Sequence, residues 1–168
     1  MNTLDVIILI IVTIPALLGL KNGFLKSIFS LAGIITGFFI ATKYYDKTAS
    51  LFSFIKMDEK LMYVISFIVI LLITYLAFVY ISKAISGINF ITKTFDRIMG
   101  TAFGLLKGLI LASLFLMITT KTFELFSKSN VEKSMFYSAV VNIAPDVYNY
   151  AMKFFPDAKN FYEEIKKL

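Results

Sequence analysis

Apolar and charged residues alternate in blocks along the chain, and this pattern predicts its elements. We expect four helices, the first headed by Asp5, over about residues 5–20, 27–42, 61–82 and 98–120. A helix needs about 20 apolar residues to cross a bilayer. The last two runs reach that length, and lysines flanking the first two can extend toward the headgroups. The pattern predicts an all-α, polytopic membrane protein with a four-helix transmembrane bundle in residues 1–120.

The first two runs allow an alternative arrangement because both are short. They could form a re-entrant or tilted hairpin across residues 21–26, although we favour two separate spans. Pro15 lies inside the first run and is expected to kink it or to free a carbonyl group, which membrane helices tolerate. No basic residue precedes this run and no small-residue cleavage site follows it, so we expect it to remain as a helix.

Small residues recur every four positions in three of the four runs. Residues at this spacing share a helix face, and a face without bulky side chains lets another backbone approach closely. We interpret these faces as helix-packing surfaces. Their members are Pro15, Gly19 and Gly23 in the first run, Gly33, Gly37 and Ala41 in the second, and Gly100, Gly104 and Gly108 in the fourth. The third run has bulky Phe67, Tyr75, Phe78 and Tyr80 instead, and we expect it to face lipid.

Lys107 is a basic residue near the middle of the fourth run, where a charge is costly and marks a candidate polar site. Asp5 and Asp96, at run borders, are the plausible carboxylate partners because the runs contain no acid. Otherwise Lys107 contacts carbonyls, water or lipid phosphate, or extends toward the headgroups. Asp96 could instead stabilise a helix N-terminus, with neighbouring Arg97 among the headgroups.

Residues 121–168 form a more polar tail in which apolar residues keep a helical period. One such face comprises Tyr137, Val140, Val141, Ala144, Tyr148 and Ala151, and a second comprises Ala158, Phe161, Tyr162, Ile165 and Leu168. We predict amphipathic helices that lie on the membrane surface or pack on the bundle, and we favour packing because the charges are mixed.

Composition narrows the chemistry. The chain is 58% hydrophobic, carries a net charge of +6, and contains no cysteine or histidine. The commonest general base, thiol nucleophiles and Cys-ligated zinc are therefore absent, and no phosphate-binding glycine loop occurs. We expect no enzyme activity, cofactor, metal or nucleic-acid ligand. The expected partners are the lipid bilayer and either further copies of the chain or other membrane proteins.

The distribution of basic residues predicts the orientation. No lysine or arginine precedes the first run, whereas Lys21 and Lys26 follow it, and short basic loops favour the cytoplasm. Both termini are then expected outside the cytoplasm. The loop between the third and fourth runs agrees with this orientation, but four lysines between the second and third runs oppose it.

Residues 95–108, FDRIMGTAFGLLKG, resemble the DRxxGxxxGxxRG signature of the colicin V production protein family. Asp5 at the head of the first run, Gly23-Phe24 after it, and ATKYY at residues 41–45 extend the resemblance over about residues 4–118. Asn22 and Ser27 replace a base and an acid that relatives often carry around Gly23-Phe24, and Lys107 replaces an arginine.

The resemblance implies a four-helix protein of the bacterial plasma membrane, linked to peptide-toxin production or export and to envelope maintenance. Two classes of function remain open. In the first, the protein is a secretion accessory that uses its glycine faces to bind itself or partners. In the second, it is a small oligomeric channel or transporter with Lys107 lining the path. The few polar residues of the fourth run favour the accessory role.

Overall fold

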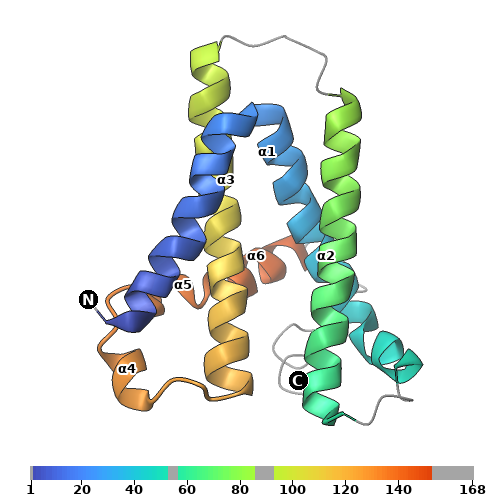
Figure 1. The fold of residues 1–168 in the computed structure, drawn as a ribbon, viewed down its shortest axis with the longest axis vertical. Helices are drawn as coiled ribbons and strands as arrows, with labels where there is room; N and C mark the ends of the chain where they lie inside the picture. Colours follow the sequence, from blue (N-terminus) through green and yellow to red (C-terminus); the bar gives the residue numbers. More distant parts are fainter. Residues whose placement is uncertain (1, 53–56, 86–92, 153–168) are drawn as a thin grey trace.

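The computed structural model describes residues 2–52, 57–85 and 93–152, and the regular structure in these ranges is helical. Three long helices dominate the fold (Figure 1). All three are long and apolar enough to cross a membrane, the third being continued by the π-helical turn η1. The elements are α1 Thr3–Leu51, α2 Glu59–Ile85, α3 Lys93–Leu116, η1 Met117–Thr122, α4 Lys128–Glu132, α5 Tyr137–Val140 and α6 Ile143–Met152.

Helix α1 contains both of the first two predicted helices. Its backbone leaves helical geometry at Gly23, where φ is 79° and ψ is 179°, and the ribbon bends back on itself there (Figure 1). Glycine adopts this positive φ without the steric cost that a Cβ atom imposes. The predicted connection over residues 21–26 is therefore reduced to one non-helical residue. Helical backbone angles continue through Pro15, so the break lies at the glycine.

The two halves of α1 pack against different helices. The half before Gly23 lies along α3, and the half after it lies along α2 (Figure 1). Buried residues from both halves, from α3 and from the tail form one hydrophobic cluster, with Ile8, Phe38, Leu116 and Tyr148 among its members. This core lies toward the end of the molecule that carries the N-terminus.

Helix α2 was expected to face lipid, and it is the least buried of the three long helices. Tyr80 is 76% exposed, but Phe67 is buried and its ring packs edge-on against Phe38 at 6.0 Å between centroids. Phe78 and Tyr75 lie against Gly33 of α1. Phe67, Tyr75 and Phe78 are exceptions because they pack on α1, Phe67 on Phe38 and the other two on Gly33, which makes room for them.

The described part of the tail packs on the long helices. Val140, Val141, Ala144 and Tyr148 are buried, and the Tyr148 ring stacks on Phe39 at 4.6 Å. The buried Ser113 hydroxyl of α3 donates to the Val141 carbonyl (2.8 Å) and accepts from the Ala144 amide (2.9 Å). The second predicted face, residues 158–168, and the side chain of Ala151 lie outside the described part of the chain.

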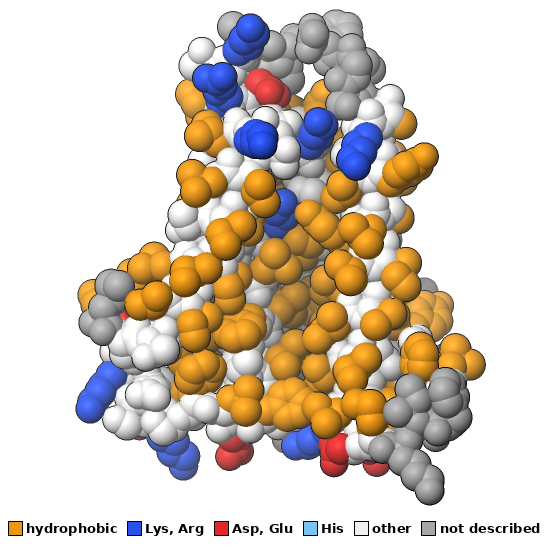
Figure 2. Space-filling model, viewed as in Figure 1, with side chains coloured by type: hydrophobic (Ala, Val, Ile, Leu, Met, Phe, Trp, Pro, Cys, Tyr) orange, Lys and Arg blue, Asp and Glu red, His pale blue; other side chains and the backbone are white. Residues whose placement is uncertain are grey.

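The two ends of the molecule differ in charge (Figure 2). At the end formed by the Gly23 break, the close of α2 and the start of α3, basic side chains gather around one acid. At the end that holds the N-terminus and the tail, basic and acidic side chains are mixed. The five basic residues of the first end are Lys21, Lys26, Lys83, Lys93 and Arg97, and its acid is Asp96.

Candidate functional site

Lys107 lies where α3 meets both α2 and the second half of α1. Its side chain is 6% exposed. The ammonium Nζ donates to the Ser30 hydroxyl of α1 at 3.3 Å, and it lies 5.8 Å from the centre of the Tyr75 ring of α2. A cation near an aromatic face is attracted by the electrons of the ring. A hydroxyl and an aromatic ring from two other helices therefore surround the charge.

Ser30 is oriented to accept the hydrogen bond from Lys107. Its own hydroxyl proton is donated to the backbone carbonyl of Ser27 at 2.9 Å, and both serines are buried. A hydroxyl whose proton is engaged elsewhere presents its lone pairs to a neighbouring donor. The Ser27 carbonyl thus fixes the direction in which Ser30 meets the ammonium group.

Asp5 does not reach Lys107, because it lies at the end of the molecule that carries the N-terminus, whereas Lys107 lies near the middle of α3 (Figure 1). Its carboxylate completes the cap of α1, where Oδ2 accepts from the Asn2 amide at 2.9 Å. Its Oδ1 accepts from the Ser134 hydroxyl (2.6 Å) and from the amides of Met135 (3.0 Å) and Phe136 (3.3 Å). Asp5 therefore ties the tail to the start of α1.

Asp96 is also engaged elsewhere. Its Oδ1 accepts from the backbone amide of Phe24 at 2.8 Å, at the first residue after the break in α1. The break releases this amide from a helical partner, and a carboxylate at a helix N-terminus satisfies it. Neighbouring Arg97 is exposed at the same end. Among the described residues, the suggested pairing of Lys107 with Asp5 or Asp96 is not formed.

The predicted glycine faces lie at both interfaces of α1. A methyl group added at Gly108 would lie 2.7 Å from the Val12 carbonyl oxygen, and one at Gly104 would collide with the Pro15 carbonyl. Gly19 and Gly100 face each other in the same way. Gly23 packs against Gly100 and the Asp96 carboxylate, whereas Gly33 and Gly37 face α2.

Sequence reasoning missed Ser30 and Ser134. Ser30 carried a signal, because it precedes Gly33 and Gly37 by three and seven residues and so shares their helix face. Ser134 carried none, because it meets Asp5 across 129 residues of sequence. Tyr75 was assigned to lipid on size alone.

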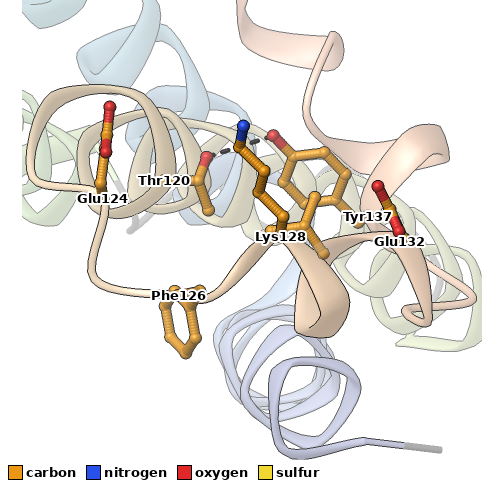
Figure 3. Close-up of a pocket in the computed structure, with 7 residues that line it drawn as sticks. Thr120, Glu124, Phe126, Lys128, Glu132 and Tyr137 are labelled. Atoms are coloured by element: carbon orange, nitrogen blue, oxygen red, sulfur yellow. Dashed lines mark hydrogen bonds between the residues drawn. The ribbon is translucent and has the colours of Figure 1, made fainter.

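A separate cavity of about 350 Å³ lies where α3 ends and the tail begins. Figure 3 shows Lys128 reaching over the hydrogen bond between the Thr120 and Tyr137 hydroxyls, which are 3.1 Å apart. Glu124 and Glu132 stand at its two sides. Its lining residues lie in η1 and the tail, so this cavity is not part of the Lys107 site.

The family comparison covers most of the chain that builds these contacts. The family model for colicin V production protein matches residues 4–145. The chain belongs to the colicin V production protein family. A colicin V production protein homolog of Haemophilus influenzae is 29% identical over 131 residues, which cover 72% of this chain and 76% of that protein. No solved structure matches.

The colicin V production match extends beyond the helices that carry the signature. It includes Ser134 and Ala144, whose hydrogen bonds join the tail to Asp5 and to Ser113. The sequence resemblance had ended near residue 118. The longer match agrees with the packing, since this part of the tail contributes buried residues to the common core.

Proposed function

We propose that the chain is a bacterial plasma-membrane protein that acts as an accessory to peptide-toxin production and export and, more broadly, to envelope maintenance. The observation that carries this proposal is membership of the colicin V production protein family. The name of the Haemophilus influenzae relative supports it. The proposal assigns no catalytic step to the chain. The glycine faces are occupied by contacts between α1, α2 and α3, so partners bind other surfaces of the protein.

The proposed topology has four membrane passes, with α1 crossing twice. At 1.5 Å per residue, the 49 residues of α1 measure about 73 Å, more than twice the roughly 30 Å of a bilayer core. The bend at Gly23 returns the second half toward the end where α1 begins (Figure 1). Each half is then long enough for one pass.

In this topology both termini lie outside the cytoplasm and the Gly23 end faces it. The chain has no cysteine, so single cysteines report the two sides cleanly. Asn22→Cys probes the exposed break and Met135→Cys probes the tail, where Met135 is 71% exposed. In intact spheroplasts, an impermeant maleimide should label Met135→Cys alone, with Asn22→Cys labelled after lysis. The reverse pattern would invert the orientation.

The packing of α3 supports the accessory role over a channel. Gly104 and Gly108 bring α3 against the backbone of α1, which leaves no room for a path at that interface. Lys107 donates to Ser30 and lies near Tyr75, an arrangement that holds three helices together. We assign Lys107 the role of setting the relative positions of α1, α2 and α3.

The test uses toxin-producing cells that lack their own family member. Toxin in the medium and in the cells is measured after complementation with the wild-type chain, with Lys107→Met, or with Ala102→Leu as an exposed control on α3. We expect export with the wild type and the control. Failure of the wild type to restore export would reject the role. Ion flux in liposomes, present in the wild type and lost in Lys107→Met, would identify a channel instead.

A further inference from the structure

Basic side chains gather at the end of the molecule that contains the Gly23 break. Lys21, Lys93 and Arg97 are exposed there, and Lys26 is half-buried beside the break. These residues come from α1 and α3, which the glycine contacts bring together. Four of the five basic side chains at this end, which come from distant parts of the sequence, therefore share one surface, and the fifth is Lys83 of α2.

Among the described residues, Asp96 is the one acid at this end, and it does little to neutralise that surface. Asp96 is half-buried, its Oδ1 accepts from the Phe24 amide at 2.8 Å, and its carboxylate packs against Gly23. One carboxylate offsets one of the positive charges of Lys21, Lys26, Lys93 and Arg97, so the described residues of this end keep a net positive charge.

The opposite end provides an internal contrast. Lys43, Lys47 and Lys133 are exposed there, but acids are interleaved with them in sequence and space, among them Asp46 and Glu132. Figure 2 shows acidic side chains interspersed with basic ones at this end, whereas basic side chains predominate at the other. Within residues 2–52, 57–85 and 93–152, a surface on which basic side chains predominate is therefore present at one end only.

We propose that the basic end, defined as Lys21, Lys26, Lys93 and Arg97, binds the phosphate groups of anionic phospholipids in the leaflet that surrounds it. These residues border apolar helices, so their charged groups lie at headgroup depth once the helices are in a bilayer. Each basic residue near an anionic surface strengthens the attraction by about fivefold in affinity. The inference goes beyond the proposed function and does not depend on toxin export.

The experiment counts lipids bound to the purified full chain in detergent. Phosphatidylglycerol or phosphatidylcholine is added at matched concentrations, and bound lipids are counted by native mass spectrometry. The test variant is Lys21→Gln/Lys26→Gln/Arg97→Gln, and the control Lys43→Gln/Lys47→Gln/Lys133→Gln removes the same charge from the opposite end. Lys93→Gln alone serves as a milder variant if the triple variant does not fold.

The proposal expects the wild type and the control to retain phosphatidylglycerol over phosphatidylcholine. The basic-end variant should lose that preference by at least about tenfold, and Lys93→Gln by about fivefold or less. Added salt should weaken the preference in the wild type because it screens exposed charges. Equal losses in the two triple variants, or no preference in the wild type, would overturn the assignment.

Discussion

The two halves of α1 pack by different means. The half before Gly23 meets α3 backbone to backbone, and added methyl groups at Gly19, Gly100 or Gly104 would collide with carbonyl groups. The half after Gly23 meets α2 through side chains as well as backbone, with Phe78 against Gly33 and with Thr74 and the Leu71 backbone against Gly37. The first interface has little freedom to adjust, whereas the atoms around Gly37 lie farther away and can accommodate a change by a small shift.

This difference between the two interfaces explains where the polar site around Lys107 lies. Small-residue faces allow close packing of helices in a membrane, where lipid is as apolar as the helices themselves. The α1–α2 interface includes Tyr75 and Ser30, and the Lys107 ammonium group lies beside both of them. One face of α1 therefore fixes the position of α3, and the other face receives the charged group that α3 carries.

Replacing one glycine by alanine at each interface should give the largest difference in stability between the two interfaces. Gly104→Ala forces a methyl group into the Pro15 carbonyl, and overpacking of this kind lowers the free energy of unfolding by about 1–3 kcal/mol. At Gly37 the nearest atoms lie 3.1–3.4 Å away, so Gly37→Ala needs only a small shift. The higher helix propensity of alanine, about 1 kcal/mol, favours both variants, but it nearly offsets the cost only at Gly37.

The measurement for this pair is unfolding of the purified protein in mixed micelles, followed by circular dichroism during SDS titration. Ala102→Leu adds bulk at an exposed position of α3 and should behave as the wild type. Equal destabilisation by Gly104→Ala and Gly37→Ala would show that the two interfaces do not differ as described.

The break between the two halves should respond to loss of its cap. Asp96→Ala removes the acceptor of the Phe24 amide and should destabilise the protein by about 1 kcal/mol. Asp96→Asn keeps a side-chain oxygen and should recover most of this loss. Hydrogen exchange at Phe24 reports the change directly. If the Phe24 amide exchanged as slowly in Asp96→Ala as in the wild type, the Asp96 carboxylate would not be the cap at this break.

The sequence allowed part of this arrangement to be predicted. Glycines at a spacing of four mark close-packing faces because helical geometry alone puts them in line, and apolar runs indicate the helices because bilayer thickness sets their length. The length of the non-helical segment at the break could not be predicted in this way. Local sequence does not reveal that Lys21 and Asn22 remain helical and that only Gly23 departs.

The polar contacts were the least predictable part. Asp5 and Lys107 were natural partners by charge, yet Asp5 binds tail groups about 130 residues away in sequence, and Lys107 binds a neutral hydroxyl. Opposite charges need not pair when backbone amides and hydroxyls lie closer in the folded chain. Ser30 could have been selected by its helix face, but Ser134 required the fold.

The contact between Lys107 and Ser30, which bridges α3 and α1, should give the smallest measurable effect. Hydrogen bonds between membrane helices average about 0.6 kcal/mol in double-mutant cycles, because other groups replace the lost partner. A cycle of Lys107→Met and Ser30→Ala, measured in the same micelles, should give a coupling of about that size. Ser27→Ala offers the matched control, since Ser27 contributes its backbone carbonyl to Ser30 and should show no coupling with Lys107→Met. Coupling for Ser27 equal to that for Ser30 would mean that Lys107 stabilises the helices through general packing. A zero coupling for Ser30 would mean that the Tyr75 ring, and not Ser30, holds the ammonium group in position.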